Sequence, residues 1–265
     1  MRVGTWNVEY ADVAATNVRR RAAMRRNRAD IWVLTETHDC LWPPTGNVSA
    51  AHSDQRSFYG TRVKEMSRWV SIWTRYPIIA RPRLRGADRE RTTIALIKTP
   101  VGQVLVYGTV LPWNGDKGRY GMNAEASGWS EHHRVIPLQI AEWKRLRSRF
   151  PRAALCVAGD LNTDLDRGGY YGTRRGIAML RAGLRAQGLY CASAPGRLRR
   201  GLLAHPPIDH VVLPAAWSDR TSVVSAWEGR NGKPRMSDHS GLVVEIRGKP
   251  DGPGRQPFAN SGLLR

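Results

Sequence analysis

The sequence predicts an α/β fold in which two mixed, mostly antiparallel β-sheets pack face to face with helices outside. Short apolar and β-branched runs recur along the whole chain, which indicates strands. Helical patterns separate only some of these runs, and this disfavours a strictly alternating βα barrel. The runs 92–98 and 104–110, joined by a segment with Pro100 and Gly102, are typical of an antiparallel hairpin.

Each expected element follows from its local pattern. The apolar runs predict strands at 2–8, 31–34, 69–73, 92–98, 104–110, 153–158, 208–213 and 241–246. Apolar residues at helical spacing predict helices at 17–28, 139–150 and 173–187. Pro137 lacks an amide donor, so the second helix is expected to begin or kink there.

The length of 265 residues fits one large α/β domain. We expect this domain to cover residues 1–247. The segment 248–265 is dense in Gly and Pro and lacks periodicity, which predicts a flexible tail.

The chain is strongly basic, with 42 Lys+Arg against 22 Asp+Glu and a formal net charge of +20. A charge of this sign favours a polyanionic partner, and nucleic acid is the first candidate. The basic residues are 36 Arg and only 6 Lys, a skew that GC-rich codon usage alone would also produce. The charge therefore indicates a class of partner and does not identify a reaction.

Cys40, Cys156 and Cys191 are odd in number and lack CxxC spacing, which argues against disulfides or a zinc cluster. The chain opens on a strand-like run without a secretory leader. No apolar run approaches the ~20 residues that a membrane-spanning helix needs. We therefore expect a cytoplasmic protein with no membrane segment, and no protein partner is evident.

Polar side chains stand at or beside the ends of several apolar runs. They are Asn7 in TWNVE, Glu36 in LTET, Asp160 and Asn162 in GDLNTD, Asp209 in IDHVVL, and Asp238 and His239 in SDHSGL. A single acid after a strand is more often a solvated turn residue. Together these carboxylates, amides and a histidine suit a hard cation and a phosphoryl group, because Mg²⁺ prefers carboxylate and water oxygens.

Mg²⁺, or Mn²⁺ in its place, is the expected cofactor. Glu36 and Asp238 are the expected principal ligands. Asn7 could hold a ligand, a water or a phosphate oxygen without adding charge, which suits an anionic substrate.

The order and spread of these motifs over residues 1–247 resemble the endonuclease/exonuclease/phosphatase superfamily. The resemblance implies a four-layer α/β sandwich and in-line attack of water on a phosphoester. It implies that Asp160 orients or deprotonates that water, and that Asn162 positions it and donates to the developing negative charge. It further implies that His239 contacts the scissile phosphate while Asp209 holds its ring.

The alternatives without a functional role are a buried, hydrogen-bonded core histidine for His239 and a turn residue for Asp209. His210 directly follows Asp209 on a strand and is expected to point to the opposite face, away from the site.

One position departs from the family pattern. Many relatives carry His or Tyr where this chain has Val110, so either the strand is shifted or another group supplies that phosphate contact. The following loop region offers polar, basic and aromatic candidates, although such loops are more often merely solvated. The candidates are Trp113, Asn114, Lys117, Arg119, His132, His133 and Arg134.

Eight of the 10 tryptophans fall into two groups. Those in strand-like runs are expected in the core, namely Trp6, Trp32, Trp69 and Trp73. Four others are expected in loops, where stacking on a base is an option. These are Trp42, Trp113, Trp129 and Trp227.

The leading functional prediction is a metal-dependent nuclease acting on DNA. The first alternative uses the same site for a small or lipid phosphoester, of the phosphoinositide or sphingomyelin type. A second alternative is a nucleic-acid-binding relative without catalysis. The presence of every motif residue argues against the last.

Overall fold

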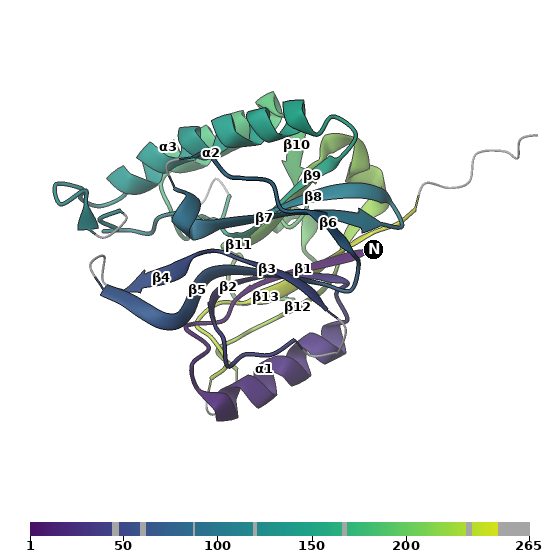
Figure 1. Cartoon of the computed structure of the whole chain (residues 1–265), viewed down its shortest axis with the longest axis horizontal. Helices are drawn as coiled ribbons and strands as arrows, with labels where there is room; N and C mark the ends of the chain where they lie inside the picture. Colours follow the sequence, from purple (N-terminus) through teal and green to yellow (C-terminus); the bar gives the residue numbers. More distant parts are fainter. Residues whose placement is uncertain are drawn as a thin grey trace, which may run out of the picture.

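The computed structural model describes residues 1–43, 48–58, 62–86, 88–118, 121–165, 169–231 and 235–248. Two sheets pack face to face, with α2 and α3 covering one outer face and α1 covering the other (Figure 1). This is the expected four-layer α/β sandwich. Within the tail expected at 248–265, all positions after Gly248 lie outside the described residues.

The first sheet has seven strands in the order β12-β13-β1-β2-β5-β3, with β4 also paired to β5. Its pairing is antiparallel except between β1 and β2. The strands are β1 (Arg2–Asn7), β2 (Ile31–His38), β3 (Ser49–His52), β4 (Gln55–Phe58), β5 (Arg62–Thr74), β12 (Thr221–Trp227) and β13 (Gly241–Ile246).

The second sheet has six strands in the order β10-β11-β9-β8-β7-β6. Here only β8 and β9 pair in parallel. The strands are β6 (Ile78–Ala80), β7 (Thr92–Thr99), β8 (Gly102–Val110), β9 (Ala154–Asp160), β10 (Leu189–Cys191) and β11 (Asp209–Pro214).

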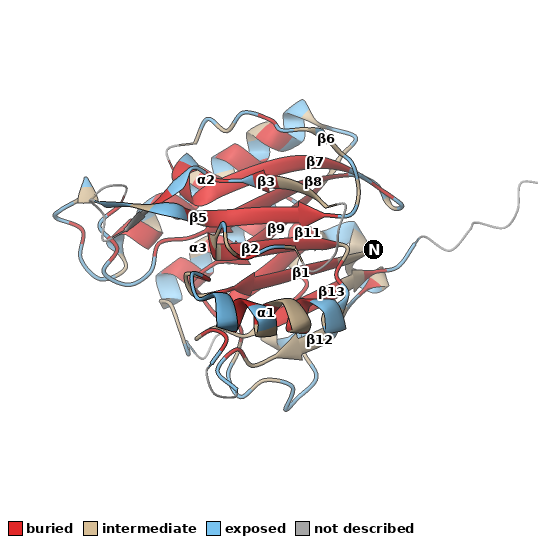
Figure 2. Cartoon of the chain, turned by 60° about the horizontal axis from the view of Figure 1, so that its bottom comes forward, coloured by how far each residue is buried: buried red, intermediate tan, exposed pale blue. Residues whose placement is uncertain are grey.

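The α-helices are α1 (Ala14–Asn27), α2 (Ser130–Arg149) and α3 (Arg174–Ala186). Short 3₁₀ helices lie at Arg89–Arg91, Pro195–Arg197 and Ala215–Arg220. The central strands are buried on both faces, the edge strands such as β12 are only partly buried, and each helix exposes one side (Figure 2). Buried side chains form one cluster between the sheets and one under each helical layer, which explains why the strands read as apolar runs.

Strand direction brings the expected site residues to one edge of the sandwich. β1 and β9 end at Asn7 and Asp160, and β2 carries Glu36 near its end. β11 starts at Asp209, whose Cα pairs directly with that of Asp160 in the antiparallel register. β13 starts just after His239 and runs antiparallel to β1. The ends of strands from both sheets therefore converge.

Two features of local structure differ from expectation. Helix α2 begins at Ser130 and contains Pro137, so the helix does not start at this proline. Pro137 is exposed, so water can satisfy the carbonyl that loses its amide partner. Trp227 belongs to β12 and packs edge-on against Trp6 and Trp32, so it is not a loop residue.

Several short strands were not expected, namely β3, β4, β6, β10 and β12. The four tryptophans assigned to the core are at most 4% exposed, as predicted. In the part of the chain that the structure describes, no helix combines the length and apolar character needed to cross a membrane.

Candidate active site

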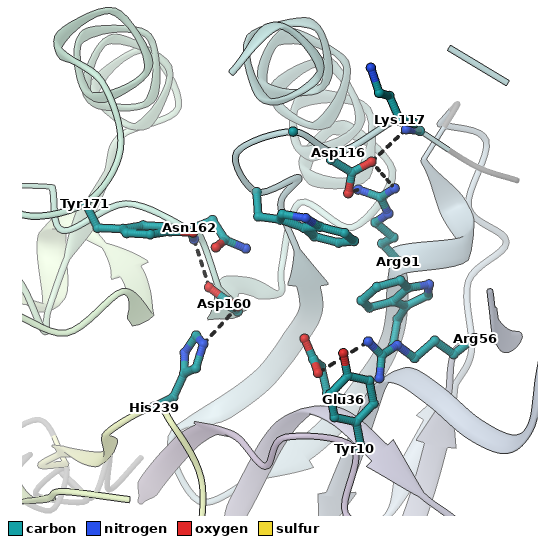
Figure 3. A pocket seen from close by; sticks show the side chains of 14 residues that line it. Tyr10, Glu36, Arg56, Arg91, Asp116, Lys117, Asp160, Asn162, Tyr171 and His239 are labelled. Atoms are coloured by element: carbon teal, nitrogen blue, oxygen red, sulfur yellow. Dashed lines mark hydrogen bonds and ion pairs between the residues drawn. The ribbon is translucent and has the colours of Figure 1, made fainter. Parts of the chain in front are cut away.

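A cavity of about 500 Å³ opens at the edge where the strand ends converge. Asp160, Asn162 and His239 lie on one side of it, and Arg56 and Arg91 lie on the other, with Glu36 between them (Figure 3). Residues from both sheets and from the loops between them therefore share one space.

Asp160 is fixed by hydrogen bonds to both carboxylate oxygens. Asn7 Nδ2 donates to Oδ2 at 3.1 Å, and the backbone amide of Asn162 donates to Oδ1 at 2.9 Å. The preceding Gly159 has φ +131°, and a Cβ there would lie 2.1 Å from the carbonyl oxygen of Thr109. The glycine of the GDLN motif is thus required for β9 to approach β8 and deliver Asp160.

Burial raises the pKa of Asp160 to about 7, and the charge of Asp209 also raises it against the opposing effect of His239. A carboxylate with a pKa near neutrality can accept a proton from water at physiological pH. Asn162 has φ +48°, and its side-chain amide donates to the carbonyl of Leu111 at 2.8 Å. Both residues of the motif are therefore rigidly held.

His239 forms a buried pair with Asp209. Its Nδ1 lies 2.7 Å from Asp209 Oδ2, and its Nε2 lies 4.0 Å from Asp160 Oδ2. Burial alone would lower the pKa of His239, but the charges of Asp209 and Asp160 raise it to about 10. The ring is therefore an imidazolium at neutral pH, with Nδ1 donating to Asp209 and Nε2 available as a donor.

Two contacts join the loop before β13 to β1. The Trp6 indole donates to the carbonyl of His239 at 3.1 Å, and the hydroxyl of Ser237 donates to the carbonyl of Asn7 at 2.6 Å. Ser237 also accepts the backbone amide of His239 at 3.0 Å. The TWN and SDH motifs are thus one hydrogen-bonded unit.

Arg20 on α1 supports the same unit from behind. Its buried guanidinium donates to the backbone carbonyls of Met236 and Glu9, at 2.7 and 3.3 Å. These two carbonyls belong to the loop before β13 and the loop after β1. Arg20 therefore ties two loops of the site to each other without entering the cavity.

Glu36 extends from β2 into the cavity with a strained backbone. Its φ is +54°, a conformation that costs a non-glycine residue about 1–3 kcal/mol and is concentrated at functional sites. Its Oε2 lies 3.4 Å from a terminal nitrogen of Arg56, while Oε1 accepts no hydrogen bond from the described residues. One carboxylate oxygen is therefore free to meet a cation.

The donor set fits a hard divalent cation. Glu36 supplies the free oxygen, and Asp209 Oδ1 is buried without a hydrogen-bond donor among the described residues. Asn7 Oδ1 accepts the backbone amide of Glu9, and neither Asn7 nor Asp209 is among the residues that line the cavity. Asp160, Asp209 and His239 offer ligand atoms within 4.8 Å of one another. We favour a carboxylate site near Glu36, because an imidazolium bonded to Asp209 cannot bind a cation.

Asp238 lies at the margin of the site. Its side chain is 40% exposed, and Oδ1 lies 4.0 Å from Nε2 of His239. It is not among the residues that line the cavity, whereas Glu36 is. The structure therefore brings Asp238 next to the histidine and does not show it converging with Glu36 on one point.

The loop candidates are mostly not part of the cavity. Trp113 and Lys117 line it, but Asn114 is exposed outside it. His133 bonds to the hydroxyl of Thr173 at 2.7 Å, and Arg134 forms a bidentate pair with Glu131. These two side chains lie on α2, which begins before them and directs them to other partners. Another loop candidate, Arg119, lies outside the described residues.

His132 and His210 are both buried away from the cavity. His132 Nδ1 contacts the carbonyl of Pro112 at 2.6 Å. His210 Nε2 contacts the carbonyl of Thr163 at 2.8 Å, as expected for a strand neighbour of Asp209 that faces the other side.

Tyr171 enters the cavity from the loop between β9 and α3, which the sequence did not indicate. Its backbone amide donates to Asp164 Oδ2 at 3.1 Å, and its ring packs edge-on against Trp129. Burial raises its pKa to about 12, and the charges of Asp160 and Asp238 add to this. Its hydroxyl is therefore protonated at neutral pH and points over Asn162 (Figure 3).

Other lining residues also lacked a sequence signal. They are Tyr10, Arg56, Arg91 and Asp116, together with Trp69, which was assigned to the core alone. Arg56 and Arg91 were indistinguishable from the many surface arginines.

Comparison with known proteins points to one family. A family model described as Endonuclease/Exonuclease/phosphatase family matches residues 4–239. No curated protein matches the chain.

Solved structures resemble the chain over nearly its whole length. The endonuclease domain of TRAS1, a telomere-specific non-LTR retrotransposon, is 18% identical with a TM-score of 0.61, covering 93% of this chain and 97% of that domain. The 3′ phosphatase NExo from Neisseria, bound to a product DNA hairpin, is 17% identical with a TM-score of 0.63, covering 93% and 99%. An AP endonuclease from Archaeoglobus fulgidus is 13% identical with a TM-score of 0.62, also covering 93% and 99%. At these identities the likeness concerns the fold.

Proposed function

The chain belongs to the Endonuclease/Exonuclease/phosphatase family, and on that premise we propose that it hydrolyses phosphodiester bonds in DNA with Mg²⁺ or Mn²⁺. Family membership supports a phosphoester hydrolase, and the net charge of +20 supports a polyanionic substrate. The observation that carries the proposal is the position of Asp160, held by Asn7 and Asn162 and 4.0 Å from the imidazolium of His239.

Asp160 acts on the attacking water. Its two hydrogen bonds fix the carboxylate, and its raised pKa makes it a proton acceptor near neutral pH. Asn162 retains a second amide hydrogen beyond the one given to Leu111, and this hydrogen can orient the water or the phosphate.

His239 and Tyr171 act on the phosphate. The imidazolium Nε2 and the protonated Tyr171 hydroxyl both present hydrogen-bond donors to developing negative charge. Tyr171 therefore supplies from another loop the contact that the family pattern would place at Val110. Val110 itself is only 1% exposed and packs in the core.

Glu36 would hold the cation, with Asn7 and Asp238 as the further ligands that the motifs imply. Bound there, a divalent cation supplies charge neutralisation at the phosphoryl oxygens. Arg56 fixes one oxygen of Glu36 and leaves the other free.

A second candidate is hydrolysis of a small phosphoester, and the size of the cavity favours it. A volume of about 500 Å³ lies within the range of roughly 300–1,000 Å³ typical of small-ligand pockets. The same catalytic groups would serve either substrate.

A cleavage panel separates these candidates. It compares plasmid, single-stranded and abasic DNA, RNA and phospholipid headgroups with Mg²⁺ at two salt concentrations. A DNA nuclease cuts at least one DNA form, with activity that falls steeply with salt. Hydrolysis of a small phosphoester without cleavage of any DNA would contradict the proposal.

A further inference from the structure

The half of the cavity away from His239 has a different chemistry from the hydrolytic half. It is lined by Trp69, Arg91, Trp113 and Asp116, which we call the aromatic half. We propose that the aromatic half binds the base of one unpaired nucleotide, stacked on Trp113, next to the scissile phosphate. The identity of that phosphate as the reacting group rests on the proposed function.

Trp113 is both accessible and fixed. Its side chain is 37% exposed and lines the cavity. Its ring centroid lies 5.7 Å from that of the buried Trp69, with the rings tilted by 36°. The Arg91 guanidinium carbon lies 5.4 Å from the Trp113 ring centroid. A ring already held by neighbours loses little conformational freedom when a base stacks on it.

The loop after Trp113 is held in place by hydrogen bonds and an ion pair. Arg91 is 3% exposed and forms a bidentate pair with Asp116, at 2.8 and 2.7 Å. Asp116 also accepts the backbone amide of Gly118 at 2.6 Å, and the amide of Gly115 donates to the carbonyl of Gly128 at 2.7 Å. These bonds hold the loop after Trp113 as a wall of the cavity.

The guanidinium of this half, that of Arg91, is neutralised by Asp116. The neighbouring Arg56 lies 4.3 Å from the Trp69 ring, turns one terminal nitrogen to Glu36 and keeps Nε and Nη1 buried, where they cannot meet a ligand. An uncharged planar group therefore suits the aromatic half better than another phosphate. Nucleobases are such groups, and stacking of a base on an aromatic side chain contributes about 1–3 kcal/mol.

The shape of the site selects an unpaired base. A base inside a duplex is covered on both faces by its neighbours and must leave the stack to enter a pocket. A cavity of about 500 Å³ has room for one such unit and not for a duplex. Single strands and unpaired ends are thus the favoured substrates.

The other tryptophans expected in loops are not placed to do this. Trp129 is covered edge-on by His132 and Tyr171, and Trp227 packs against Trp6 in the core. Trp42 is 65% exposed but does not line the cavity. It provides a matched control, because its removal takes away an exposed indole without touching the aromatic half.

Equilibrium binding tests the proposal without any turnover. Calorimetry compares dAMP with 2-deoxyribose 5-phosphate in the presence of Mg²⁺, since the two probes share a phosphate and differ in the base. We expect wild type and Trp42→Ala to bind dAMP at least about 10-fold more tightly than 2-deoxyribose 5-phosphate. The preference should fall to within about 2-fold in Trp113→Ala and be largely kept in Trp113→Phe.

Equal affinity of wild type for the two probes would overturn the proposal, as would an unchanged preference in Trp113→Ala or no binding of dAMP at millimolar concentration. In a competition, a single-stranded oligonucleotide should displace dAMP at least about 10-fold better than the same sequence in a blunt duplex. Equal displacement would overturn the preference for unpaired bases. A protein that binds dAMP through Trp113 but cleaves no DNA would lose the proposed function and keep this inference.

Discussion

Replacement of Asp209 with asparagine tests how far the charge behind His239 contributes to catalysis. The Asp209 carboxylate is 1% exposed and lies 2.7 Å from Nδ1 of His239, and its other oxygen has no donor among the described residues. Its negative charge raises the pKa of His239, to which it is hydrogen-bonded, and also that of Asp160. The Asp209→Asn substitution keeps the size of the side chain and one acceptor oxygen while removing the charge that favours the imidazolium.

The magnitude follows from the type of bond that is weakened. A hydrogen bond to a charged group contributes about 1.5–3 kcal/mol. If this contribution is lost in the transition state, turnover falls by about 10- to 150-fold, since each 1.36 kcal/mol changes the rate 10-fold. The assay is the kcat for a phosphodiester at saturating Mg²⁺, with the melting temperature measured in parallel.

Glu142→Gln provides the matched control. Glu142 is 5% exposed and pairs with Arg145 at 2.5 Å on α2, outside the cavity. This variant should keep the wild-type kcat although it also loses a buried carboxylate. A folded Asp209→Asn protein with kcat within about 2-fold of wild type would refute the reasoning about His239.

Glu36→Gln should raise the Mg²⁺ concentration for half-maximal activity by at least about 10-fold, because loss of a direct ligand should weaken metal binding at least as much as loss of a residue that only orients a ligand. An unchanged metal titration would exclude Glu36 as a ligand. Arg56→Met should leave the free energy of unfolding within about 1 kcal/mol, because Nε and Nη1 are already buried without partners. It should still lower kcat by roughly 10-fold by releasing Glu36, and unchanged kcat would argue against that role. His132 has its pKa lowered to about 4 by burial, so its stabilising contribution is full above pH 6.5 and is lost as pH falls toward 4. From pH 7 to pH 5, wild type should lose about 2 kcal/mol more unfolding free energy than His132→Gln, and equal losses in urea titrations would contradict this.

The strand-end residues could be predicted because strand direction is a simple geometric constraint. Asp160 and Asp209 had to meet once β9 and β11 paired antiparallel, and Asn7 follows from the same edge. The resemblance of the motifs to a family then assigned them roles, which stay predictions. The sequence pattern also predicted the two packed sheets, since buried strands read as apolar runs.

The other side of the cavity could not be predicted, because it depends on loops and short strands. Arg56 lies on β4, a four-residue strand with no distinctive pattern. Tyr171 reaches the site only through the fold of the loop after β9, where Asp164 fixes its backbone.

The candidates on α2 show the opposite failure. His133 and Arg134 were grouped with the active-site loop, but the helix starts at Ser130. Helical geometry then turns their side chains toward Thr173 and Glu131. Pro137 misled the assignment, because a proline exposed to solvent is tolerated within a helix.

The central role of Asp160 is tested most directly by comparing wild type with Asp160→Asn. Both proteins are stripped of metal, and hydrolysis is measured as Mg²⁺ is added back. We expect wild type to gain phosphodiesterase activity with Mg²⁺, and the variant to turn over at least about 100-fold more slowly at an unchanged melting temperature. Equal turnover by the two proteins, or full activity of wild type without metal, would contradict the assignment of this cavity as a metal-dependent hydrolytic site.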